Sequence, residues 1–291
     1  LVDKLSDERD AKYIRFKAGL GAAIHRFQVG DLIKARALTR ELTEFAHESG
    51  SARALSFAHL AEAGIAANSG DIQRAVAELQ RGRDAAVDPF YRCLAELYLG
   101  GGLVAVGNLD AARAVVEPGL RFSEEHAFLQ GVLLHRLNQA TLLLAEGELT
   151  RGMNQLLAVK QEMGKLGFSA EFQATMTQAR VYAQIATGGA TASIGSAIGT
   201  MVRNPGFVWG HARKASQTAR DLLADLSENL SPDNEGARFN IEFEFGKLLI
   251  KRKERDEARK HLEKAISFLQ PLGDTQGMRD ARALLATLEP K

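Results

Sequence analysis

The sequence is poor in the residues on which several common classes of protein depend. It contains one cysteine, Cys93, six prolines and one tryptophan in 291 residues. A single cysteine cannot form an internal disulfide and offers at most one thiolate to a metal, which excludes disulfide-rich and cysteine-ligated zinc domains. An excess of one charge is also missing, since 37 basic residues face 36 acidic ones. Whole-surface attraction to nucleic acid or to an anionic membrane is therefore not expected.

A targeting signal and a convincing membrane span are missing as well. The first ten residues are largely charged, and the longest uncharged stretch, 181–202, consists mostly of Gly, Ala, Ser and Thr. Such a stretch is long enough to span a bilayer but gains too little from leaving water. We expect a cytoplasmic protein, because one lone cysteine suits a reducing compartment. The sequence opens with Leu1 rather than methionine, so we also expect a longer parent protein.

What the sequence does contain is an internal repeat. With 45% hydrophobic and 25% charged residues it has the composition of a folded protein. Five glycines recur at intervals of 37 to 41 residues: Gly30, Gly70, Gly107, Gly147 and Gly188. Five residues after them stand the small residues Ala35, Ala75, Ala112, Gly152 and Ser193. Seven residues before them stand Ala23, Ala63, Gly100, Ala140 and Val181, four of which are small. A sixth copy fits if Lys253 occupies the turn, with Gly246 before it and Ala258 after it.

Close packing of paired helices explains this spacing. Two helices can approach closely only where each offers Gly, Ala or Ser at the crossing point. The turn glycine can end the first helix in a left-handed conformation, and a following Asp or Asn can cap the second. Apolar residues on both flanks follow the helical period, as in Leu32, Ala35 and Leu38, and strand alternation is missing. The sequence therefore predicts an all-α fold.

The pattern resembles tetratricopeptide (TPR) repeats, most clearly from Phe245-Gly246 through Ala258 to Leu272-Gly273-Asp274. Its period exceeds the TPR period of about 34 residues, which implies helices roughly a turn longer. HEAT repeats share the longer period but lack the turn glycine paired with a small residue. The resemblance implies a right-handed superhelix, an α-solenoid of about six helix pairs that forms a single domain over residues 1–291. The expected units are 11–50, 51–87, 88–126, 127–167, 168–203 and 234–272, with an extra helix over 206–230 and a C-terminal capping helix over 274–289.

The Gly-rich segment around 188–210 interrupts the repeat spacing. Glycine disfavours a helix there by about 1 kcal/mol per position relative to alanine. A hinge or flap is one interpretation, but tight packing of the small residues against the extra helix is favoured. The role of the segment stays open.

No residues in the sequence have the spacing of a known catalytic or metal-binding motif. The seven histidines are scattered, and none forms a His-Glu-x-x-His pattern or a metal-ligand spacing with Cys93. Cys93 is expected to pack in the core. The clusters Gly19-Leu20-Gly21 and Gly100-Gly101-Gly102 lack the Lys-Ser/Thr of a phosphate loop. The basic run from Lys247 to Lys260 alternates with acids, which favours a solvated surface over a nucleic-acid site. We expect no enzyme, no cofactor and no metal.

A binding surface is expected on the concave face. The TPR resemblance implies that first-helix residues three, six, ten and thirteen before the turn face the groove. The candidate binding residues are therefore Leu20, Ile24, Phe27, Phe57, Leu60, Leu97, Val104, Leu137, Tyr182, Asn240, Phe243 and Lys247. This lining is mainly apolar and lacks the Lys and Asn set with which TPR carboxylate clamps hold chaperone C-termini. It suits an amphipathic helix or apolar peptide. Alternatively, the longer helices close the groove into core, and the residues leave both options open.

The resulting hypothesis is a non-catalytic regulatory module that binds a protein or peptide segment, which could belong to another domain of the parent chain. The long period and the stretch Ala258 to Leu288 resemble the C-terminal repeats of large bacterial signalling regulators, such as nucleotidyl cyclases with an ATPase core and MalT-like activators. That resemblance implies a sensor or scaffold role. The alternative is a small-molecule receptor in which the groove or the 188–210 segment encloses an inducer. A homodimer stays open, whereas a nucleic acid or membrane partner is not expected.

Overall fold

The computed structural model describes residues 18, 19, 21–23, 26, 31–168, 170–187, 204–230 and 234–289. Within them the chain is all-α, as predicted, and its helices pack in sequence as pairs. Among the described residues no helix is both long enough and apolar enough to cross a membrane. The helices are α2 (Leu32–Ser49), α3 (Ala52–Asn68), α4 (Ile72–Ala85), α5 (Pro89–Ala105), α6 (Leu109–Glu125), α7 (Leu129–Ala145), α8 (Leu149–Lys165), α9 (Glu171–Ala186), α11 (Pro205–His211), α12 (Ala215–Asn229), α13 (Glu235–Lys251), α14 (Arg255–Leu269), the 3₁₀ turn η2 (Gln270–Leu272) and α15 (Gln276–Ala286).

The predicted turn glycines have one shared geometry. Gly70, Gly107 and Gly147 have φ angles of 81°, 81° and 84°, in the left-handed region that side chains disfavour. At Gly107 the Asn108 amide donates to the Leu103 carbonyl at 2.9 Å, and the Asn108 side chain accepts from the Ala111 amide at 3.3 Å. The glycine thus ends one helix while its neighbour caps the next. The turns predicted at Gly30 and Gly188 lie outside the described residues.

The sixth turn contains Lys253, as the sequence predicted. Lys253 has a φ of 65°, and the following Glu254 amide donates to the Leu249 carbonyl at 3.0 Å, which matches the bond after Gly107. A residue with a Cβ pays about 1–2 kcal/mol for this conformation. The turn therefore forms without glycine because the helix packing on both sides fixes it.

Replacing Lys253 with glycine is expected to raise the free energy of unfolding by about 0.5–1 kcal/mol. The substitution removes the left-handed strain, and the greater freedom of glycine in the unfolded chain offsets part of the gain. Urea titration followed by circular dichroism measures the change. The matched control is Lys260→Gly in the exposed middle of α14, which should lower stability by about 1 kcal/mol. A loss of stability from both substitutions would contradict the assigned strain.

The small residues lie at the helix crossings, which confirms the packing explanation of the repeat. Ala112, Ala140 and Ala258 are completely buried. A Cβ on Gly246 of α13 would lie 2.5 Å from Leu262 Cδ2 of α14, which is well inside van der Waals contact. In a densely packed core, Leu262 could move away only at a cost in stability. Close approach of the two helices therefore requires glycine at this position.

The fifth helix pair differs from the predicted units. The extra helix expected over 206–230 is divided by a turn at 212–214 into α11 and α12. Helix α12 packs along α9 as the second helix of a pair, with fully buried Ala215 and Ala219 in the same core cluster as Val181. The second helix expected within 168–203 falls largely on residues 188–203, which lie outside the described residues. The interruption in the repeat is thus an insertion between the two helices of one pair.

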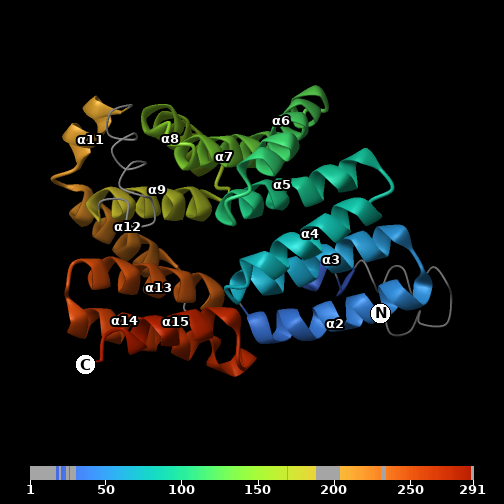
Figure 1. The fold of residues 1–291 in the computed structure, drawn as a ribbon. Coiled ribbons are helices and arrows are strands. Elements are labelled where there is room, and N and C mark those ends of the chain that lie inside the picture. The colour runs from blue at the N-terminus through green and yellow to red at the C-terminus, as the bar shows by residue number, and fades with distance from the viewer. Residues whose placement is uncertain are drawn as a thin grey trace.

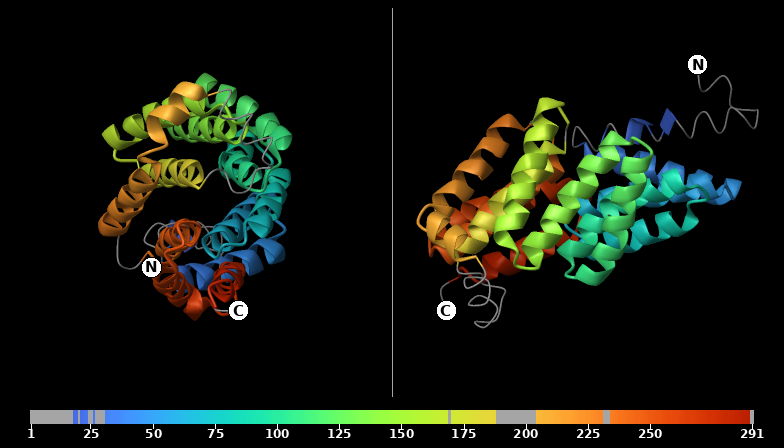
Figure 2. Two further views of the ribbon diagram at one scale, coloured as in Figure 1. Left: turned by 60° about the vertical axis from the view of Figure 1, so that its left-hand side comes forward. Right: turned by 90° about the horizontal axis from the view of Figure 1, so that it is seen from above.

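The helix pairs follow one another as an α-solenoid, as predicted, and the solenoid curves until its last pair meets its first, so that it forms a ring (Figure 1). The first helices of successive pairs, α3, α5, α7, α9 and α13, each contact the next, and α13 contacts α3 again. Figure 2 shows this circuit, with the last helices, α13 to α15, beside α2 to α4. The two ends of the described chain therefore share an interface, here named the ring closure.

Candidate binding sites

The residues predicted to line the groove divide into three groups. Leu20, Ile24 and Phe27 lie outside the described residues. The second group is buried in the helix packing and comprises Leu97, Val104, Leu137 and Tyr182. The third is half-buried and comprises Phe57, Leu60, Asn240, Phe243 and Lys247. Only the third group presents surface to a ligand in this structure.

The register of the exposed face on α5 explains why Leu97 and Val104 are buried. Tyr98 and Ala105 are exposed, whereas the preceding residues Leu97 and Val104 are buried. One residue along a helix turns the side chain by about 100°. Leu97 and Val104 therefore point into the helix packing, one position away from the exposed side chains of this helix.

Lys247, one of the half-buried residues of α13, belongs to a charged group that links this helix to α9. Glu244 of α13 accepts from Arg180 Nε of α9 at 2.8 Å and from Lys247 Nζ at 2.8 Å. Lys247 also lies 5.1 Å from the ring centre of Phe243. Burial alone would raise the pKa of Glu244, but the positive charges of Arg180 and Lys247 outweigh it and lower the pKa. This network holds α9 and α13 together and leaves Phe243 partly accessible beside it.

Aromatic side chains form a continuous band across three successive helix pairs, in which Phe90 is exposed and the other three are half-buried. Ring centres are 4.9 Å apart for Phe57 and Tyr91, 5.8 Å for Tyr91 and Phe90, and 5.1 Å for Phe90 and Phe128. Phe90 is 44% exposed, and the neighbouring Leu129 is 51% exposed. We name Phe57, Phe90, Tyr91 and Phe128 the aromatic rim, because three of them lie at or just after the turns that connect the pairs. Exposed apolar patches of this kind are characteristic of interaction surfaces.

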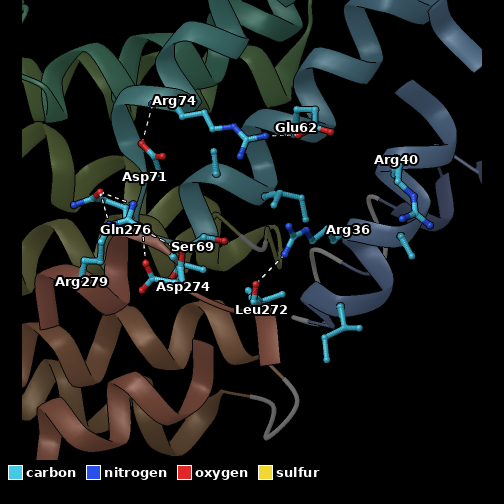
Figure 3. Close-up of a pocket in the computed structure, with 15 residues that line it drawn as sticks. Arg36, Arg40, Glu62, Ser69, Asp71, Arg74, Leu272, Asp274, Gln276 and Arg279 are labelled. Atoms are coloured by element: carbon cyan, nitrogen blue, oxygen red, sulfur yellow. Dashed lines mark hydrogen bonds and ion pairs between the residues drawn. The ribbon is translucent and has the colours of Figure 1, made fainter. Parts of the chain in front are cut away.

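A cleft lies at the ring closure and contains about 610 Å³ (Figure 3). Its walls come from α2, α3, α4 and the segment from η2 into α15. The charged residues of the lining are Arg36, Arg40, Glu62, Asp71, Arg74, Asp274 and Arg279. No signal in the sequence marked this site, because its walls are far apart in the chain, with 236 residues between Arg36 and Leu272.

Backbone contacts beside the cleft close the ring. The Gly277 amide, in the first turn of α15, donates to the carbonyl of Ser69 at the end of α3 at 2.9 Å. A Cβ on Gly70 would lie 2.7 Å from Gly277 Cα, so the two backbones are in contact. A buried apolar cluster continues the interface from α2 to α13, α14 and α15 through Leu32, Phe239, Ala265, Leu269, Leu272 and Met278.

Cys93 lies beside a histidine, an arrangement that sequence spacing did not predict. Its Sγ is 3.8 Å from His135 Nε2 and 3.5 Å from Ser123 Oγ, and all three residues are buried. Burial raises the pKa of the Cys93 thiol and lowers the pKa of His135 to about 4. The pair therefore consists of a thiol and a neutral imidazole at pH 7, whereas nucleophilic catalysis needs a thiolate. In the part of the chain that the structure describes, no three His, Cys, Asp or Glu residues are placed to hold a metal ion.

The Cys93 thiol is expected to react slowly with Ellman's reagent in the native protein and completely in concentrated guanidinium chloride. Reactivity follows thiolate content and exposure, and Cys93 is only 2% exposed with a raised pKa. Absorbance of the released thiol reagent at pH 8 measures the rate in both states. Rapid labelling of the native protein would contradict the buried, protonated state.

No family model and no curated protein matches the sequence. The chain is similar to a solved TPR domain. This domain, from P58(IPK), has 15% sequence identity over 95% of this chain and 67% of that chain, with a TM-score of 0.30. The helix pairs, the glycine turns and the small crossing residues described above are features of this chain's own structure.

Proposed function

We propose that this protein is a non-catalytic interaction module that binds a protein segment carrying apolar side chains. The aromatic rim carries this proposal. Its rings are in contact across α3, α5 and α7, and Phe90 and Leu129 are close to half exposed. Aromatic residues are enriched in protein interfaces and dominate their binding energy.

The geometry of the rim supports one extended contact rather than isolated apolar residues. The Arg53 guanidinium lies 4.8 Å from the Tyr91 ring centre and 3.5 Å from a carboxylate oxygen of Asp88. These contacts fix Tyr91 between Phe57 and Phe90, so a partner meets a preorganised surface with little side-chain entropy left to lose. The half-buried Phe243 and Lys247 on α13 remain a predicted second contact of the same kind.

The finer hypotheses stay predictions. They are a sensor or scaffold role within a larger bacterial signalling protein, a cytoplasmic location, and a partner that is another domain of the same chain. The diffuse resemblance of the stretch from Ala258 to Leu288 supports the first of them.

Replacing Phe90 or Leu129 with serine is expected to weaken peptide binding about tenfold or more. The probes are peptides selected from a displayed amphipathic library against the immobilised protein, with affinities measured by biolayer interferometry. Truncating a central aromatic or apolar contact of an interface commonly costs more than 1 kcal/mol. Both side chains are exposed, so the fold should survive the changes.

The matched control is Leu157→Ser on α8, where a leucine 41% exposed lies outside the aromatic rim. The selected peptides should bind this variant as they bind the unchanged protein. Two results would contradict the proposal: a library that yields no binding peptide, or peptides that bind Phe90→Ser and Leu129→Ser with undiminished affinity.

A further inference from the structure

The cleft at the ring closure contains more positive charge than its carboxylates neutralise. Arg74 donates to Glu62 at 2.9 Å, and Arg279 donates to Asp274 at 2.9 Å (Figure 3). The third acid, Asp71, accepts from the Arg74 amide at 3.0 Å as the cap of α4. Arg74 and Arg279 are thus each paired with one carboxylate, and Asp71 adds one further negative charge. With Arg36 and Arg40 on the α2 side, four arginines face three acids in the lining, an excess of one positive charge.

On the α2 side, Arg36 and Arg40 lie one helical turn apart on the same face. Arg36 Nη1 donates to the Leu272 carbonyl at 2.9 Å, an acceptor that carries no net charge. The nearest carboxylate to Arg40 is Glu44, with Nε and Oε1 4.0 Å apart and both side chains about two-thirds exposed or more. Such an exposed pair neutralises little charge. Two guanidinium groups therefore line the cleft without a strong acidic partner.

Two helix starts add to this positive field. The capping residues of α4 and α15, Asp71 and Thr275, both line the cleft. The first turn of a helix carries a partial positive charge, which favours anions nearby. The carboxylate of Asp71 offsets part of this effect at α4. At α15 the Gly277 amide donates to the Ser69 carbonyl at 2.9 Å and the Met278 amide donates to the Thr275 hydroxyl at 3.3 Å, so this helix start contributes its dipole but no free donor from these two amides.

We propose that this cleft binds a small molecule bearing a phosphate or carboxylate group, with the oxyanion held by Arg36 and Arg40. The planar guanidinium matches both oxyanions through paired hydrogen bonds. A volume of about 610 Å³ suits a small molecule rather than a folded partner. Because α2 and α15 form opposite walls, a bound ligand also stabilises the ring closure. The site is separate from the aromatic rim and does not depend on the protein-binding role.

The test is calorimetric titration of the full chain at low ionic strength with inorganic phosphate, pyrophosphate and citrate. We expect saturable binding of at least one probe and a rise of the unfolding temperature in its presence. Arg40→Gln is expected to weaken that binding about tenfold, through loss of one charge-assisted contact. This variant keeps the hydrogen bond from Arg36 to Leu272, so the closure itself is preserved.

The matched control is Arg151→Gln on α8, because Arg151 is 74% exposed and 3.9 Å from Glu148, much as Arg40 is placed near Glu44. Binding of phosphate or pyrophosphate alone identifies a phosphate site, and binding of citrate alone identifies a carboxylate site. The proposal is overturned if no probe binds, or if Arg40→Gln and Arg151→Gln weaken binding equally. Phe90→Ser should bind the probe normally, so failure of the rim proposal is distinguishable from failure of this one.

Discussion

Replacing Gly277 with alanine is expected to lower the free energy of unfolding by about 2–3 kcal/mol and to loosen the ring closure. The added Cβ would lie 2.6 Å from Phe239 Cζ and 2.9 Å from the Ser69 carbonyl oxygen. Phe239 is 2% exposed within the buried cluster of the closure, so its ring has no space into which to move. Overpacking of this kind typically costs about 1–3 kcal/mol, and here it also disturbs the hydrogen bond from the Gly277 amide to Ser69.

Two measurements distinguish this result from a merely local effect. Urea unfolding gives the loss of stability, and small-angle scattering gives the radius of gyration, which should increase when α15 separates from α3. The matched control is Gly210→Ala in α11, where an added Cβ meets no atom within 4 Å. That substitution should be neutral or slightly stabilising, because alanine favours a helix. A stable Gly277→Ala protein with an unchanged radius would show that the closure is not tightly packed there.

Local rules made most of the fold predictable from the sequence. The left-handed turn at Lys253 was found without a glycine, because Gly246 and Ala258 occupy the expected offsets around it. Helix boundaries near Gly70, Gly107 and Gly147 follow from the same spacing. These features depend on residues only a few turns apart, so the sequence pattern records them directly.

Features that depend on distant segments could not be predicted in the same way. Helix α12 pairs with α9 although an insertion separates the two helices in the sequence, and the ring closure joins Ser69 to Gly277. Neither contact leaves a periodic signal, because each involves a single site and no repeated residue type. The cleft was missed for the same reason, although Arg36 and Arg40 are visible in the sequence as neighbours on one helical face.

The second large effect concerns pH. Lowering the pH from 7 to 4 is expected to destabilise the protein by about 3 kcal/mol through His135. Burial lowers the pKa of this residue from 6.5 to about 4, so between these values only the unfolded chain binds the proton. Stability therefore falls as the pH decreases through this range, by about 1.4 kcal/mol per pH unit at most. His135 is completely buried, and neither Cys93 nor Ser123 beside it carries a negative charge that would stabilise an imidazolium.

The buried carboxylates of Glu242 and Glu244 change the free energy of unfolding only at lower pH. The pKa of Glu242 is lowered below its ordinary 4.5, because hydrogen bonds from His261 and Lys264 outweigh the effect of burial. The stability that Glu242 and Glu244 contribute is present above pH 4.5 and is lost only as the pH falls through their lowered pKa values. Burial raises the pKa of Glu96, against the opposing charges of Arg83 and Arg92, so this carboxyl binds its proton above pH 4.5 and offsets part of the loss as the pH falls. The effect of His135 is therefore isolated by comparing the protein with a His135 variant over the same pH interval.

Comparison of the unchanged protein with His135→Leu tests this assignment. Leucine is similar in volume and removes the buried Nδ1, which has no hydrogen-bond partner. Urea unfolding at pH 7 and pH 5 should show a loss of stability about 2 kcal/mol smaller in His135→Leu than in the unchanged protein. The matched control, His47→Leu at an exposed position of α2, should keep the full loss. Equal losses in His135→Leu and the unchanged protein would mean that His135 binds its proton in the folded state, and the burial argument for both His135 and Cys93 would fail with it.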